Sequence, residues 1–498
     1  MKKKTILLVA FLALVAFPAA ALAAPAPAAT TGGWEFTLGG FVKLETWWDS
    51  TQMDKALNAR TQRNNDPNFH HGQLRFTAQG TRFNLSIKGP KLFGASTSAL
   101  IEMDFDKEGD ARQAPSHSYT PRLRHAMFRL NWPETELLFG QFWSLLCEFP
   151  AETVQDGGFY LTGSPTHRLA QIRFTQKFAD MFRVAFLVGV PTNTGDAIWE
   201  ASQNRPVPFG VSSSLGLAGT SAETPHLQGL FAFERDLYGK AAFYGRPRGF
   251  VAQVAAAWQR TRYRNNVVGL TGNTWGHDRH NATLAAAAFQ DNNQIMNNWV
   301  VQGTLFIPII PTRTANLAGT ASLSTQWFIG QGVGAFGLGN DGDNSYWVWV
   351  GPGGVFDPVN LRFTQGFYDL KLTNRYGGYV QAQYYFTNQW FLTAAYGMTK
   401  AFGVTQERNF LAPVVAGVLD RSKYLTASDQ MKTLQQFLIG LWYTPITSVK
   451  FGLQYQYNRT DWFQKRMGFN QNINTFGPGN ITDIGENHSV RFTALYFF

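Results

Sequence analysis

The sequence predicts an all-β protein, a transmembrane antiparallel β-barrel of about sixteen strands with short periplasmic turns, long extracellular loops and one loop folded into the lumen. Three observations lead to this fold class. Apolar residues recur with a period of two along most of the chain, and the connections between these segments alternate between short and long. Only 15% of the residues are charged, whereas about a quarter is usual in a soluble protein.

The chain begins with a segment that is typical of exported proteins. Three lysines precede an apolar run from Ile6 to Phe17, and an A-x-A cleavage site follows at Ala21–Ala23. A membrane-spanning helix would need about 20 residues. We therefore predict a signal peptide over residues 1–23, with a buried N-terminal helix as the alternative, then an Ala/Pro leader over 24–33 and one barrel domain over 34–498.

The predicted strands carry apolar side chains on one face and polar side chains on the other. In the first strand, Trp34–Trp48, tryptophans stand at both ends of the apolar stripe, as in the aromatic girdles of membrane barrels. The same alternation predicts further strands near 73–88, 95–106, 121–132, 136–144, 168–178, 182–190, 227–235, 249–263, 298–307, 317–329, 376–386, 390–400, 434–443, 449–460 and 487–498.

The connections between these strands are alternately short and long. Short ones at 89–94, 133–136, 178–181, 387–389 and 444–448 are separated by long ones such as 49–72, 191–226 and 401–433. Two connections, 236–248 and 308–316, are of middling length and interrupt this alternation. Sorting of short turns and long loops to opposite ends is typical of a transmembrane barrel with an even number of strands.

The last strand ends on an alternating aromatic stripe. Val490, Phe492, Ala494, Tyr496 and Phe498 share one face. Because a strand edge in lipid cannot stay unpaired, we expect this strand to pair with the first and close the barrel.

The polar faces of the strands predict the charges that line the lumen. The expected acidic residues are Glu45, Glu102 and Asp104, which we place toward the outer mouth. The expected basic residues are Arg173, Arg183 and, beyond a bulge near Gly80 that changes the phase of the second strand, Arg82.

Arg122 and Arg124 do not follow the alternation, because they share parity with the apolar residues Phe128, Leu130 and Trp132. Three arrangements are open: the arginines lie at the membrane interface, a bulge turns them inward, or this wall faces a neighbouring subunit. An arginine in the middle of the bilayer would cost about 2–4 kcal/mol, so we favour the second and third arrangements.

Other motifs do not indicate a cofactor, a metal or catalysis. "GVGAFG" at Gly332–Gly337 lies in a Gly-rich connection and does not open a helix, so it does not indicate a nucleotide site. Asp341 and Asp343 offer a weak Ca²⁺ candidate, although a surface turn fits them better. No nucleophile–base motif is present, and we predict neither an enzyme nor a nucleic-acid-binding protein, despite a net charge of +10.

The stretch Arg82–Lys177 resembles the DcaP-like outer-membrane porins. The motifs "TRFNLSIKGP", "ALIEMDFD", "PRLRHAMFRL", "LLFGQFWSLL" and "PAETVQDGGFYLTGSPTHRLAQIRFTQ" follow one another in the order expected of that family. The resemblance implies a homotrimeric, sixteen-stranded channel in the outer membrane of a Gram-negative cell that favours small organic anions such as dicarboxylates. The terminal Phe498 also resembles the signature that barrel-assembly machinery recognises.

The loop 145–166 corresponds to the constriction loop that the resemblance implies. It carries Cys147, Glu148, Glu152 and Asp156, and we expect its acids to face Arg82, Arg122, Arg124, Arg173 and Arg183 across the lumen. The thiol of Cys147 is expected either to be reached from the lumen or to be a small buried apolar group.

The sequence therefore predicts passive diffusion of small hydrophilic solutes, in contact with lipid and lipopolysaccharide and without a cofactor. The alternative is a barrel that sheathes a partner such as an electron-transfer cytochrome, or one that presents its loops to other molecules. The arginines could also serve only to hold the loop in place.

Overall fold

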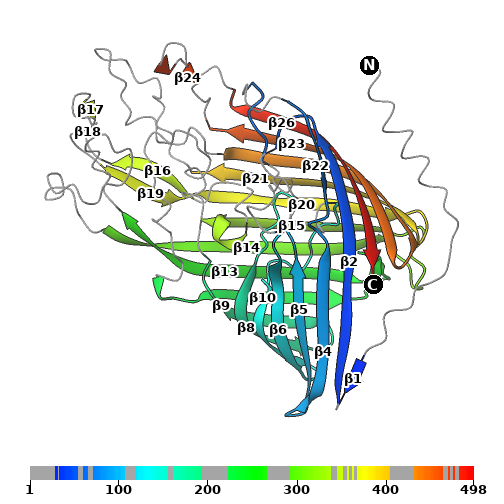
Figure 1. The fold of residues 1–498 in the computed structure, drawn as a ribbon. Helices are drawn as coiled ribbons and strands as arrows, with labels where there is room; N and C mark the ends of the chain where they lie inside the picture. The colour runs from blue at the N-terminus through cyan, green and yellow to red at the C-terminus, as the bar shows by residue number, and fades with distance from the viewer. Residues whose placement is uncertain are drawn as a thin grey trace, which may run out of the picture.

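A computed structural model describes residues 29–31, 33–53, 60–65, 71–106, 119–154, 161–192, 222–265, 292–337, 345–350, 356–357, 362–363, 367–403, 431–463, 469–470, 475–476 and 482–498. Its main feature is one antiparallel sheet of 18 strands that closes on itself (Figure 1). One of these, β1 (Ala29–Thr31), is a short addition to the edge of β2, and β3 and β4 are two parts of one interrupted strand. The closed barrel therefore has sixteen strands, as predicted.

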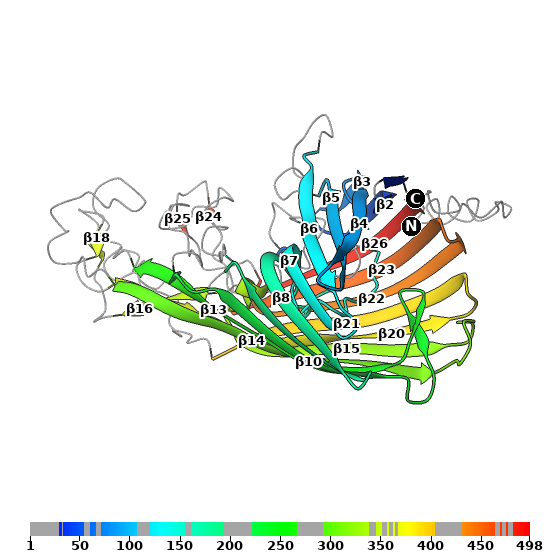
Figure 2. The same cartoon turned by 90° about the horizontal axis from the view of Figure 1, so that it is seen from below.

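The barrel strands follow one another around the sheet in chain order. They are β2 (Trp34–Asp49), β3 (Gln73–Thr77), β4 (Arg82–Leu92), β5 (Ala95–Asp104), β6 (Arg122–Asn131), β7 (Thr135–Trp143), β8 (Arg168–Phe178), β9 (Phe182–Gly189), β10 (His226–Arg235), β13 (Phe250–Asn265), β14 (Asn292–Ile310), β15 (Ala321–Gln331), β20 (Asn374–Tyr385), β21 (Trp390–Phe402), β22 (Met431–Ile446), β23 (Val449–Trp462) and β26 (Ile484–Phe497). Figure 2 shows β13, β14, β15 and β20–β23 side by side as one broad wall.

The first and last strands form the seam, where β2 in blue lies beside β26 in red in Figure 1. Their register runs from Phe41 opposite Phe497 to Asp49 opposite Ser489. Phe498 then exchanges two backbone hydrogen bonds with Gly40, each 3.2 Å long. Gly40 has φ 150°, and a Cβ there would lie 2.2 Å from the carbonyl oxygen of Arg82, so only glycine fits this close approach. The terminal strand is paired to its last residue.

The two faces of the strands have the predicted polarity. In β26, Asn487, Ser489 and Thr493 are buried, whereas Tyr496 on the other face and Phe498 just after the strand are exposed. The same holds in β9, where Phe186 is exposed and Leu187 is buried. Large apolar side chains therefore cover the outside of the barrel, as is usual where a barrel faces lipid. Among the described residues, no helix is long and apolar enough to span a membrane.

The two connections of middling length have a structural explanation. The connection from β10 to β13 contains a hairpin of its own, β11 (Ala241–Phe243) and β12 (Arg246–Arg248). The connection from β14 to β15 is joined to this hairpin by the bridge between Lys240 and Thr312. Both connections therefore lie at the end of the barrel that carries the short turns, so the alternation is preserved.

Several long connections contain short elements outside the barrel sheet. They are η5 (Val333–Phe336), β16 (Ser345–Val350) paired with β19 (Phe367–Leu372), β17 (Phe356–Asp357) paired with β18 (Arg362–Phe363), and β24 (Phe469–Asn470) paired with β25 (Thr475–Phe476). The predicted signal peptide, residues 1–23, lies outside the described residues.

The second predicted strand differs in detail from the expectation of a single bulge near Gly80. It is interrupted at residues 78–81, where the Thr81 hydroxyl accepts a hydrogen bond from the Lys43 N–H at 3.2 Å. Glu45 pairs with Thr77 and Phe41 pairs with Arg82, so the interrupted strand gains one residue relative to β2. This extra residue produces the change of phase that the sequence pattern indicated.

Candidate functional site

The described parts of the connection between β7 and β8, residues 144–154 and 161–167, fold into the barrel as predicted. Glutamines on the inner face of six strands hold its described parts by hydrogen bonds to the loop. They are Gln228, Gln302, Gln326, Gln381, Gln383, Gln436 and Gln454, on β10, β14, β15, β20, β22 and β23. All seven side chains are buried. We call this set the glutamine ladder.

The ladder satisfies backbone groups that the loop would otherwise bury without partners. The Leu145 N–H donates to Gln228 Oε1 at 2.7 Å, and the Val154 N–H donates to Gln454 Oε1 at 3.0 Å. Gln302 and Gln326 both donate to the carbonyl oxygen of Leu146, at 2.8 and 3.0 Å. On the returning part of the loop, Gly163 has φ 91°, and a Cβ there would lie 2.2 Å from a backbone oxygen of β20. The loop thus lies directly on the wall.

Glu152 belongs to this anchoring arrangement. Its backbone N–H and C=O both bond to Gln381, at 2.8 and 2.9 Å, and its carboxylate accepts from Gln383 at 2.8 Å and is paired with Lys450. The residue is 1% exposed. The expectation that Glu152 faces the arginines is wrong, because it points toward the opposite wall.

Glu148 does meet one of the predicted arginines. Its two carboxylate oxygens accept hydrogen bonds from Arg183 on β9, which also contacts Glu234 on β10 at 2.9 Å. Glu234 in turn accepts from Arg248 of β12 at 3.2 Å. A chain of four alternating charges therefore runs from the inserted loop to the β11–β12 hairpin.

Cys147 is buried in the inserted loop, and burial raises the pKa of its thiol to about 12. Of the two arrangements considered, the structure has the small buried apolar group. Asp156, the fourth predicted loop residue, lies outside the described residues.

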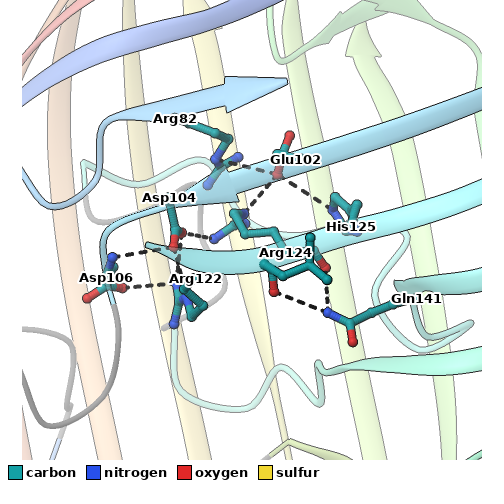
Figure 3. A network of polar contacts seen from close by, with 9 residues as sticks. Arg82, Glu102, Asp104, Asp106, Arg122, Arg124, His125 and Gln141 are labelled. Atoms are coloured by element: carbon teal, nitrogen blue, oxygen red, sulfur yellow. Dashed lines mark hydrogen bonds and ion pairs between the residues drawn. The ribbon is translucent and has the colours of Figure 1, made fainter. Parts of the chain in front are cut away.

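Arg122 and Arg124 join an acidic cluster on the neighbouring strand β5 (Figure 3). Arg124 contacts Glu102 at 2.8 Å and Asp104 at 2.5 Å, and Arg122 contacts Asp104 at 2.8 Å. Arg82 on β4 lies 3.6 Å from Glu102. The prediction that these acids lie toward the outer mouth, apart from the arginines, is therefore wrong, since the two groups are in direct contact.

A bulge in β6 makes this arrangement possible. Glu102 pairs with His125 and Met103 pairs with Leu123, so Arg124 is the extra residue. The Gln141 side-chain amide donates to the carbonyl oxygens of Leu123 and Arg124, at 3.2 and 3.0 Å, so the bulge leaves neither unbonded. Leu123 remains exposed on the outer face. Of the three arrangements considered for these arginines, the bulge is the one observed.

The other predicted residues are also paired with neighbours on the wall. Arg173 lies 3.3 Å from Glu136 on β7, which Arg129 approaches to 3.7 Å from the other side. Among the described acids of the inserted loop, neither Glu148 nor Glu152 is paired with Arg173. Glu45 pairs with Lys43 of its own strand at 2.5 Å.

These contacts define a charged wall over β4–β10. Its arginines are Arg82, Arg122, Arg124, Arg129, Arg173 and Arg183, and its acids are Glu102, Asp104, Asp106, Glu136, Glu148 and Glu234. Each of these arginines lies within 4.0 Å of an acid, and the set holds six charges of each sign. The inserted loop lies mainly on the uncharged ladder, and the two surfaces overlap only at β10.

The β11–β12 hairpin was not foreseen from the sequence. Its turn is made by Tyr244 and Gly245, both with positive φ, which is the geometry of a tight two-residue hairpin turn. Ala242 accepts a hydrogen bond from Ser322 on the inner wall at 2.9 Å, and the Tyr244 hydroxyl donates to the Ala151 carbonyl of the inserted loop at 2.8 Å. The hairpin therefore folds into the barrel. The available signal was the unusual length of this connection together with the Gly245 turn.

Within the described part of the chain, no group of three or more His, Cys, Asp or Glu residues is arranged to hold a metal ion. The Ca²⁺ candidates Asp341 and Asp343 lie outside the described residues.

Comparison with solved structures shows which known proteins have a similar fold. The structure is similar to that of the outer membrane channel DcaP of Acinetobacter baumannii, with a TM-score of 0.59 and 15% sequence identity over 94% of this chain and 99% of that one. Lower similarity is found to OprB of Pseudomonas putida (TM-score 0.48, 10% identity, 94% of each chain) and to an anion-selective porin from Comamonas acidovorans (TM-score 0.46, 9% identity, 93% and 100%).

No protein-family model and no curated protein sequence matches the chain. At 15% identity the similarity to DcaP concerns the fold. The chain has the fold of that outer-membrane channel, and the resemblance found in the sequence is confirmed at this level.

Proposed function

We propose that the protein is an outer-membrane porin that lets small hydrophilic solutes diffuse passively, with a preference for small organic anions such as dicarboxylates. The observation that carries this proposal is the division of the inner surface. The inserted loop is held on the uncharged glutamine ladder, and the charged wall lies mainly on other strands. A solute that passes the loop therefore meets fixed charges of both signs, which orient dipolar and ionic molecules.

Exposure at the Asp104–Arg122 pair supports the anion preference. The side chain of Asp104 is 0% exposed and is covered by two arginines, whereas 24% of the Arg122 side chain remains accessible. An accessible guanidinium can attract and bind a carboxylate through charge-assisted hydrogen bonds. Of this pair, the partner that is accessible to a solute is Arg122 and not Asp104.

The surroundings of the barrel are part of the same proposal. Exposed apolar side chains on the outer face suit contact with lipid, and lipopolysaccharide is the expected lipid of the outer leaflet. We infer a homotrimer, export through the cleaved signal peptide, and insertion by barrel-assembly machinery that reads the strand ending at Phe498. The predicted alternative, a sheath around a partner protein, is less compatible with the inserted loop and hairpin, because both occupy the interior that a partner would need.

Conductance of the purified protein in planar lipid bilayers tests the function. In a gradient of potassium chloride, we expect stepwise openings and a reversal potential on the anion-selective side. In liposomes, succinate should enter faster than a cation of similar size such as 1,4-diaminobutane. Absence of conductance from correctly folded protein would overturn the proposal and favour the sheath. Conductance with cation selectivity would overturn only the anion preference.

A further inference from the structure

A pocket of about 640 Å³ lies where the β11–β12 hairpin meets the inserted loop. It is lined by Pro150, Phe243, Tyr244, Arg246, Pro247 and Arg248. We propose that this pocket is a binding site for a small carboxylate joined to a planar apolar body, such as an aromatic carboxylate. The inference rests on the proposed porin function for its route of access, and it adds a binding site that the channel fold does not itself require.

The pocket is built on a fixed base. Phe149 of the inserted loop, Phe243 of the hairpin and Phe306 of β14 pack together, with ring centroids 5.1 Å apart for the first two and 5.5 Å for the last two. Phe149 is 1% exposed and Phe306 is 0% exposed. The hairpin is also tied to the β14–β15 connection by the paired backbone of Lys240 and Thr312. These contacts hold the lining residues in place before any ligand arrives, which reduces the entropy lost on binding.

One of the two arginines is already oriented. Arg248 lies over the Phe149 ring at 4.4 Å and is paired with Glu234 at 3.2 Å. Stacking on the ring fixes the plane of the guanidinium, and the ion pair fixes its direction. Arg248 therefore forms a rigid side of the pocket.

Arg246 supplies the positive charge that would bind the carboxylate of a ligand. The residue is exposed, and no carboxylate of the described residues lies within 4.0 Å of it. Glu234, the acid that pairs with the hairpin through Arg248, also contacts Arg183. The chain of four charges from Glu148 to Arg248 is balanced, so Arg246 adds one positive charge to the pocket. This favours an anionic group at Arg246.

The remaining lining selects the body of the ligand. Phe243, Tyr244 and two prolines offer flat apolar surfaces, against which an aromatic ring packs well. The volume is within the range of about 300–1,000 Å³ that is usual for small-molecule sites. A carboxylate at Arg246 and a ring against these surfaces satisfy both parts of the pocket at once. Acetate would lack the apolar contact, and benzamide would lack the charge.

Ligand-observed NMR titration of the detergent-purified full chain tests this site independently of transport. The probes are benzoate, acetate and benzamide. We expect benzoate to bind at least about tenfold more tightly than either of the others, and Arg246→Gln to weaken benzoate binding by about tenfold. Arg246→Lys should restore part of the affinity. Arg313→Gln is the matched control, since Arg313 is an exposed arginine on the neighbouring short-side connection and does not line the pocket.

The same variants should be compared in bilayers with benzoate added to potassium chloride. Benzoate should reduce the current of the wild type and of Arg313→Gln more than that of Arg246→Gln. If the channel conducts but Arg246→Gln binds benzoate as the wild type does, the site is wrong and the porin function stands. If benzoate binds through Arg246 but the protein does not conduct, the site stands and the porin function fails.

Discussion

Arg124 has the most completely buried ion pairs of the charged wall. Its side chain is 1% exposed and bridges Glu102 and Asp104, so its removal leaves two acids with fewer partners in a site that water reaches poorly. Asp104 keeps Arg122, and Glu102 keeps Arg82 at 3.6 Å, which limits the loss. We expect Arg124→Ala to lower the free energy of unfolding by about 3 kcal/mol.

Denaturant unfolding of the barrel in detergent, followed by tryptophan fluorescence, measures this loss. Lys88→Ala is the control, because the pair between Lys88 and Glu35 is mostly exposed and should contribute less than about 1 kcal/mol. Equal losses for the two variants would contradict the structural role assigned to Arg124.

Cys147 provides a test of how firmly the inserted loop is seated. The thiolate is the reactive form of cysteine, and a pKa raised to about 12 leaves almost none of it at neutral pH. A maleimide at pH 7 should therefore not label the folded protein and should not change its conductance. The same reagent should label the protein after heating in sodium dodecyl sulfate. Rapid labelling of the folded protein would show that the inserted loop leaves the glutamine ladder.

At the scale of single elements, the inserted loop depends on the glutamine ladder. Gln381 has the largest share of backbone bonds, because it satisfies both the N–H and the C=O of Glu152. Gln381→Leu would leave both groups buried without partners, at a cost of about 1–3 kcal/mol each. We expect the loop to detach in this variant, with larger single-channel conductance and cleavage of the loop by added protease.

Gln253 offers the matched control on the same inner surface. It is buried on β13, and within the described residues its side-chain amide has no hydrogen-bond partner. Gln253→Leu should leave both conductance and protease resistance unchanged. If the two leucine variants behave alike, the ladder does not hold the loop.

Individual strands were predictable because their signal is local. Alternation along β26 or β9 needs only the residues of that strand, and the seam follows from the rule that a membrane barrel has no open edge. The partners of the arginines were not predictable in the same way. They depend on register across strands, and the single extra residue at Arg124 reverses the face of Arg122 relative to Phe128. The inward fold of the β11–β12 hairpin was missed because its contacts are with residues far away in the sequence.

For the whole molecule, the main consequence is that the selectivity of the proposed channel depends on a wall of paired charges. The sequence suggested a basic wall facing an acidic loop, and the structure instead pairs almost every such charge with a neighbour. Removing one arginine therefore matters according to how many acids it leaves unpaired and how exposed those acids are. This rule separates Arg183 from Arg173, which the sequence treated as equivalent.

Arg183 lies between two partly exposed acids. The side chain of Glu148 is 21% exposed and that of Glu234 is 35% exposed. Arg183→Ala removes one positive charge and leaves Glu148 without its arginine, while Glu234 keeps only Arg248. In Arg173→Ala, Glu136 still has Arg129 at 3.7 Å.

Reversal potentials in a potassium chloride gradient should shift toward cations in both variants, and further in Arg183→Ala. Glu234→Gln should shift the potential the other way, toward anions. The differences should shrink as the salt concentration rises, because screening weakens the field of exposed charges. Equal shifts in the two arginine variants would mean that passing ions sense the number of charges in the wall and not their pairing.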